Sequence, residues 1–220
     1  MGQCRFCERK GFFLSVDTNG LCENCAPQVL HDITQRHRII EDCLRLARDG
    51  KTFATRLSRC DLLFEHLEHL LQYENKGIPT LTPSPSDILS EFKGYRDKLI
   101  IEEAQKVAQK AKEKSEVAST ITAKHNALAN GLLKSQEIIR NTSDASVGEE
   151  LERGFKYLMY KVKLDGFLEA AKKAEFKGNN KKAIDQYQEA LFLIRNDDIP
   201  DDQQGVEIQQ IEAKLIELGA

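Results

Sequence analysis

Apolar residues recur at spacings of three and four along most of the chain after residue 28, a pattern typical of amphipathic helices. The first such run covers residues 28–48 and ends at Asp49-Gly50, a helix stop signal. A second run covers residues 52–74 and has a broad apolar face. Because so short a connection favours antiparallel neighbours, the pattern predicts a helical hairpin over residues 29–76.

The clearest break in the pattern is residues 77–86, which are rich in Gly, Pro, Ser and Thr and are predicted to be a linker. The break ends in a helix start signal. Ser84 is placed as N-cap, Pro85 at the first helical position and Asp87 at the third.

A single long helix is predicted to follow over residues 87–141, because a heptad-like apolar stripe runs its whole length. The stripe consists of Ile88, Phe92, Tyr95, Leu99, Val107, Ala111, Ala118, Ile121, Leu128, Leu132 and Ile139. It is weak in its middle, where Glu103, Lys114 and His125 fall at inward positions. Three interpretations fit: a coiled coil within one chain, a dimer seam, or a long bundle helix. We favour a self-associating or partner-binding coiled coil through residues 88–139.

Residues 146–220 are predicted to form a further helical domain, opened by a capping-box sequence at 146–149. Residues 170–191 resemble a tetratricopeptide repeat, which places small residues, a turn glycine and an aromatic at set positions. The matching residues are Ala171, Ala174, Gly178, Ala183, Tyr187 and Ala190. The resemblance implies protein–protein interaction. Only one repeat is present, so the hairpin is expected to pack against a last helix over 203–218; the alternative is a plain helical hairpin without a partner.

The first 25 residues carry two Cys-x-x-Cys pairs, Cys4 with Cys7 and Cys22 with Cys25. Two residues between cysteines let a tight turn aim both sulfurs at one point, and two such turns complete a tetrahedron of thiolates around Zn²⁺. Four thiolates leave no open coordination position, so the predicted single zinc ion is structural. A redox dithiol is the alternative, but it needs a βαβ context that the pattern does not show.

The segment between the pairs supports a metal module over residues 1–28. Residues 11–16 are predicted to be a short strand, and Asn19-Gly20 is a hairpin signal. A knuckle, a hairpin and a second knuckle at a helix start resemble the treble-clef and zinc-ribbon families. The resemblance implies a zinc-stabilised fold that binds DNA, RNA or protein in its relatives.

Four other chemically distinctive residues receive ordinary roles. Cys43 and Cys60 lie nearly equidistant from the first interhelical turn and are predicted to be buried free thiols that face each other. His66 and His69 sit three apart without an HExxH pattern, so surface or boundary positions are expected.

The fold class is therefore mainly α, with a small N-terminal zinc-bound β-hairpin module, a helical hairpin, a long coiled-coil-like helix and a tetratricopeptide-like hairpin with a capping helix. Low aromatic content, 30% charged residues and the lack of long apolar runs fit this class and exclude a membrane span. The N-terminus begins with a cysteine pair rather than a secretory pattern, so a cytoplasmic protein is expected.

No nucleophile elbow, phosphate loop or dinucleotide fingerprint occurs, so the first hypothesis is a non-enzymatic zinc-binding adaptor with a protein partner. The second is a nucleic-acid-binding regulator that uses Arg36, Arg38, Arg45 and Arg48. Against it stand the net charge of -3 and the negative charge of a thiolate zinc centre. An enzyme whose site is not visible in the sequence is a weaker third.

Overall fold

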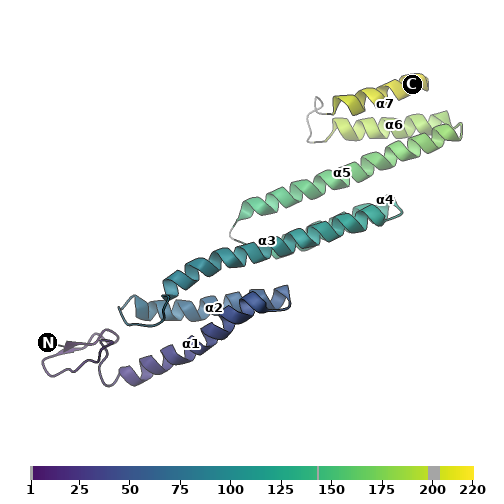
Figure 1. The fold of residues 1–220 in the computed structure, drawn as a ribbon. Coiled ribbons are helices and arrows are strands. Elements are labelled where there is room, and N and C mark those ends of the chain that lie inside the picture. The colour runs from purple at the N-terminus through teal and green to yellow at the C-terminus, as the bar shows by residue number, and fades with distance from the viewer. Residues whose placement is uncertain (1, 143, 198–203) are drawn as a thin grey trace. The chain divides into compact units, whose positions relative to one another are not determined.

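The computed structural model describes residues 2–142, 144–197 and 204–220 and shows a mainly α protein with one tiny N-terminal sheet (Figure 1). The two strands pair antiparallel, with Gly2 opposite Gly11. The elements are β1 Gly2–Gln3, β2 Lys10–Gly11, α1 Ala26–Asp49, α2 Phe53–Glu74, α3 Pro85–Val117, α4 Ile121–Ile139, α5 Ala145–Phe176, α6 Asn180–Arg195 and α7 Gly205–Glu217. The predicted fold class is confirmed at this level.

These elements form two compact units. The first comprises residues 1–103 with 141–144, and the second comprises 104–140 with 145–220. The division therefore falls inside α3 rather than at the Pro-rich break.

The first unit has one core that the metal module shares with the helices. Leu21 from the module, Val29 from α1, Leu67 from α2 and Phe92 from α3 belong to the same buried cluster. Ile78 joins them at 2% exposure. The segment predicted as a linker over residues 77–86 thus contributes Ile78 to the core, and this burial ties the segment to the first unit.

The predicted hairpin of the first two helices is confirmed. Thr52 caps α2 by accepting a hydrogen bond from the Thr55 amide at 3.1 Å, and Gly50 ends α1 with its amide bonded to the Leu46 carbonyl. The start signal of α3 is also confirmed, since the Ser84 hydroxyl accepts the Asp87 amide at 3.2 Å.

The prediction of one helix over residues 87–141 is wrong, because the chain breaks into α3 and α4 at residues 118–120. Thr120 is the N-cap of α4 and accepts a hydrogen bond from the Ala123 amide at 3.1 Å. The heptad-like stripe hid this turn, since both arms of a hairpin present the same apolar face. Ala118 and Ile121 lie three residues apart, so the spacing of the apolar stripe continued unchanged across the break.

The two arms pack on each other through small residues. A Cβ atom on Gly131 of α4 would overlap that of Ala111 on α3, and the Ser135 hydroxyl donates to the Ala104 carbonyl at 3.3 Å. Ala111 and Leu128, two residues of the stripe, are buried here together with Phe155 of α5. Much of the stripe therefore finds its partner inside the chain, and self-association through residues 88–139 stays a prediction.

The second unit ends in a helical hairpin and a covering helix. α5 begins at Ala145, one residue before the predicted capping box, and Gly178 adopts a φ of 70° in the turn that leads to α6. The small residues expected at the crossing, Ala171, Ala183 and Ala190, are fully buried beside Tyr187. α7 adds Ile211 and Leu215 to this core, whereas the predicted helix start at residue 203 lies outside the described residues.

Within the described ranges, no helix combines the length and the apolar character required to cross a bilayer.

Candidate metal centre

The first cysteine pair sits in the tight loop between β1 and β2. The Cys4 amide donates to the Arg9 carbonyl at 3.0 Å, and the Glu8 amide donates back to the Cys4 carbonyl at 2.9 Å. Glu8 takes a left-handed conformation with φ of 61° to close this loop. These bonds hold the two sulfurs on the same side of the turn.

The second pair is placed by a turn on one side and a helix on the other. One Asp17 carboxylate oxygen accepts the amides of Asn19 and Leu21 at 2.9 and 2.8 Å, and Gly20 completes the turn with φ of 77°. Cys25 is the N-cap residue of α1, and its amide donates to the Cys22 carbonyl at 3.0 Å. The knuckle thus runs directly into the helix.

Cys4, Cys7, Cys22 and Cys25 converge on one point. Their sulfur atoms all lie within 4.8 Å of one another, and the Sγ atoms of Cys7 and Cys22 are 3.9 Å apart. A tetrahedral ion with metal–sulfur bonds of about 2.3 Å requires sulfurs about 3.8 Å apart. The four predicted ligands therefore form a group able to hold a metal ion.

Backbone hydrogen bonds also favour the ionised form of one of these sulfurs, that of Cys4. Burial opposes a charge on Cys4, but backbone amides of Cys7, Cys22 and Phe6 point at its sulfur and lower its pKa to about 6. The Cys22 amide lies 3.4 Å from that sulfur. The pKa of Cys25 is raised to about 12, chiefly by hydrogen bonding to the Cys22 side chain and by burial. Four thiols this close cannot all ionise without a cation, so a bound metal ion would stabilise their ionised form.

The predicted strand over residues 11–16 is wrong. The chain turns back at Gly11, whose carbonyl accepts the Leu14 amide at 3.4 Å, and only an isolated bridge joins Val16 to Cys22. Phe12 and Phe13 lie in this turn and are 82% and fully exposed, respectively. A strand with two successive apolar residues needs a cover on both faces, and so small a module offers none.

Anchors that the spacing of cysteines did not indicate tie the module to the end of α2. The Arg5 guanidinium donates to the Gly77 carbonyl, and the Lys76 ammonium donates to the Phe6 carbonyl at 2.9 Å. Lys76 also lies 5.1 Å from the centre of the Phe6 ring, which packs at 6.0 Å from Tyr73. The only sequence signals for this contact were the two basic residues, Arg5 in the first cysteine loop and Lys76 next to Gly77.

The remaining candidate residues lie apart from the four sulfurs. Cys43 and Cys60 are free thiols buried between α1 and α2. His66 Nδ1 lies 3.0 Å from the Arg36 guanidinium, which also binds the Asp32 carboxylate at 2.9 Å. His66 is therefore part of an interhelical polar contact, and among the described residues it joins no metal-type cluster.

The basic residues of α1 are largely neutralised within the chain. Besides Arg36, Arg45 pairs with Asp42, and Arg48 bonds Glu91 at 3.0 Å. A phosphate backbone would have to compete with these carboxylates.

Comparisons of the chain with protein-family models, with curated proteins and with solved structures gave no match.

Proposed function

We propose that this chain is a non-enzymatic adaptor whose N-terminal module, held by one structural Zn²⁺ on Cys4, Cys7, Cys22 and Cys25, binds a protein partner. Tetrahedral all-sulfur sites suit zinc or iron, and four cysteine ligands leave no position for a substrate. The placement of Cys25 at the start of α1 supports the treble-clef type over the zinc ribbon.

The exposed pair Phe12 and Phe13 carries this proposal. A small module with few apolar residues displays two aromatic rings to solvent, on the turn that follows β2 and leads toward the second cysteine pair. Exposed aromatic clusters mark interaction sites, and buried aromatic anchors dominate the energetics of protein interfaces. The proposed interface is this turn, with the metal fixing its shape.

Single-stranded nucleic acid is the second candidate, because Arg9 and Lys10 lie just before the aromatic pair, separated from it only by Gly11, and both are exposed. Bases stack on aromatic rings while cations follow the phosphates. Two observations favour protein instead: Arg36, Arg45 and Arg48 of α1 pair with carboxylates of the chain, and the chain's net charge is -3. The proposed zinc-thiolate centre would add about two negative charges to the module.

The test uses the full-length protein with Phe12→Ser and Phe13→Ser combined, and Ile216→Ser as control. Ile216 is 74% exposed on α7, so its loss removes an exposed apolar side chain outside the N-terminal module and outside the hairpin of α5 and α6. Crosslinking in the native host should identify a protein that the double variant loses and the control retains, with metal content unchanged.

Binding of single-stranded oligonucleotides at several salt concentrations tests the second candidate. Steep salt dependence that requires Phe12 and Phe13 would replace the adaptor proposal with a nucleic-acid-binding one. Light scattering of the full chain addresses self-association through residues 88–139.

The tetratricopeptide-like hairpin of α5 and α6 is proposed as a further protein-binding element of the adaptor. Its buried alanines and the Tyr187 hydroxyl, which donates to Glu175, support a tight helix crossing, and α7 covers one side as a capping helix would.

A further inference from the structure

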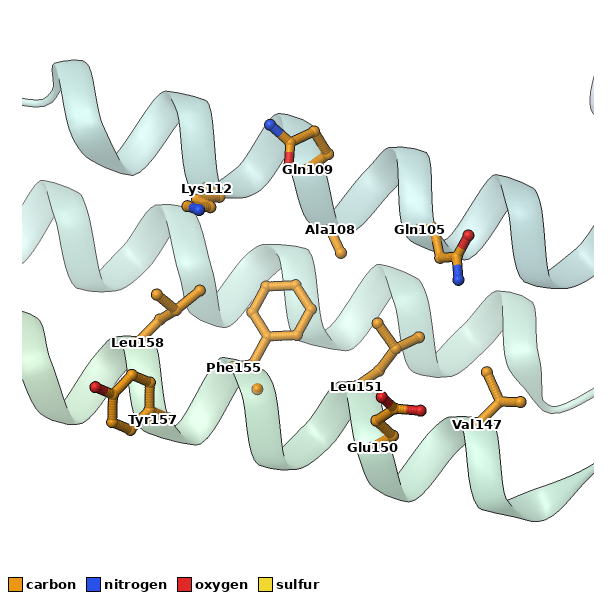
Figure 2. A pocket seen from close by; sticks show the side chains of 11 residues that line it. Gln105, Ala108, Gln109, Lys112, Val147, Glu150, Leu151, Phe155, Tyr157 and Leu158 are labelled. Carbon is orange, nitrogen blue, oxygen red and sulfur yellow. The ribbon is translucent and has the colours of Figure 1, made fainter. Parts of the chain in front are cut away.

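A groove of about 440 Å³ lies between α3 and α5 in the second unit (Figure 2). Its α5 wall is mainly apolar and presents Val147, Leu151 and Leu158. Its α3 wall is mainly polar and includes Gln105 and Gln109. One apolar wall and one polar wall are the surroundings that an amphipathic helix requires.

The apolar wall exceeds what the packing of α5 inside the unit uses. Phe155 is buried against α4, where its Cε1 atom lies 3.0 Å from the position that a Gly131 Cβ would take. Val147 and Leu151 stay half-buried in the groove. Leu158, which also packs partly against the cluster of Ala111, Leu128 and Phe155, extends the apolar stripe of this wall to about 16 Å along the helix, or three turns.

Small residues give a helix room to approach. Gly154 lines the groove, and a Cβ atom added to it would meet nothing within 4 Å. Ala108 lines the opposite wall. The distance between packed helices depends on side-chain size at the contact, so Gly154 and Ala108 allow a bound helix to pack close to both walls.

Two unlike charges lie at opposite ends of the groove. Figure 2 shows Glu150 beside Val147 at one end and Lys112 near Leu158 at the other. Both side chains are exposed, and neither has a partner among the described residues. A bound helix of complementary charge would carry a basic residue at the Glu150 end and an acidic residue at the Lys112 end.

The charges also define the direction of that occupant. α3 and α5 run the same way along the groove, from Gln105 to Lys112 and from Val147 to Leu158 (Figure 2). A helix that runs opposite to both would have its N-terminus at Lys112 and its C-terminus at Glu150. An acid in the first turn and a base in the last turn then suit its own dipole, and α3, α4, α5 and the occupant complete an up-down four-helix arrangement.

We propose that the groove between α3 and α5 binds an amphipathic helix of another protein, antiparallel to both walls, with an acidic first turn, a basic last turn and an apolar stripe of three turns. This site is independent of the metal module, since every residue that lines it belongs to the second unit.

The probe is a fluorescent helical peptide of about 18 residues, long enough to hold helix in water. Leucines at alternating spacings of three and four form its stripe, with two glutamates in the first turn and two lysines in the last. A second peptide exchanges the glutamates and lysines. Fluorescence anisotropy with the full-length protein should show saturable binding of the first peptide and roughly fivefold weaker binding of the second, the scale of exposed ion pairs.

Separate variants of the protein test the space beside Gly154 and the charges of Lys112 and Glu150. Gly154→Leu fills open space in the groove and should weaken binding by about tenfold or more, because the leucine side chain occupies space that the peptide helix needs. Gly94→Leu is the matched control, since Gly94 is also an exposed helical glycine with nothing within 4 Å, but it lies in the first unit. Lys112→Glu combined with Glu150→Lys should invert the preference between the two peptides.

Leu151→Gln provides a second groove variant that removes apolar surface without adding volume, and circular dichroism verifies its fold. The proposal is overturned if neither peptide binds saturably, or if Gly154→Leu and Gly94→Leu bind alike. It is also overturned if the chain is a dimer that Gly154→Leu converts to monomer, since the occupant is then a second copy. Phe12→Ser with Phe13→Ser should leave peptide binding intact, which separates this site from the proposed metal-module interface.

Discussion

Gly131 of α4 lies against Ala111 of α3 so closely that a Cβ atom on Gly131 would overlap the alanine's own Cβ. The Phe155 ring closes the third side, with Cε1 at 3.0 Å from that position. This contact joins three helices of the second unit.

Gly131→Ala should destabilise the second unit by roughly 1–3 kcal/mol, because the added methyl has no space and the helices must separate. Gly154→Ala is the control within the same unit. Its position is open and helical, so the same change should stabilise by up to about 1 kcal/mol. Urea denaturation followed by circular dichroism measures both; equal effects at the two positions would contradict the packing described.

Stability of the first unit should fall as the pH drops below about 6.5. Burial, followed by the nearby Arg36 guanidinium, lowers the pKa of His66. Protons therefore bind the unfolded chain at His66 before they bind the folded one. The stability that neutral His66 contributes is fully present above the pKa of His66 in the unfolded chain. It declines as the pH falls below that value toward the lower pKa of the folded protein.

Denaturation midpoints of the wild type and of His66→Gln across pH 8 to pH 5 measure this effect, because Gln keeps a hydrogen-bond acceptor for Arg36 without a titrating proton. The variant should lose less stability over that range. His31→Gln, a change at an exposed helical position, is the control. Parallel curves for the wild type and His66→Gln would refute the role assigned to His66.

Cys43 and Cys60 should resist thiol reagents in the folded protein. Burial raises the pKa of both thiols, that of Cys60 to about 11, and the thiolate is the reactive form. Mass spectrometry after iodoacetamide treatment at pH 8 should find both unmodified until denaturant is added. Rapid modification of either in the native protein would show that the core between α1 and α2 opens.

Local signals carried the successful sequence predictions. The spacing within each Cys-x-x-Cys pair, the hydroxyl of Ser84 before Pro85, and Gly178 in its turn all act within a few residues. Their outcome hardly depends on distant contacts.

The failures involve choices that only tertiary contacts make. No Gly or Pro marks a turn near Thr120, whose capping hydroxyl was overlooked within the stripe, and the contact of Ala111 with Gly131 that favours the turn joins residues twenty apart. Ile78 belongs to a Pro-rich segment by composition and to the core by position. The groove beside Gly154 depends on which faces of α3 and α5 meet, which periodicity alone does not specify.

The metal content of the purified full-length protein decides whether the four converging sulfurs of the N-terminal module hold a zinc ion. Elemental analysis should find one zinc per chain in the wild type and in Cys43→Ala, whose sulfur lies outside the cluster. Cys22→Ser should lose the ion and the structure of the module, while the helices of the second unit stay folded. Absence of metal from the wild type, or one zinc retained in Cys22→Ser, would contradict the account.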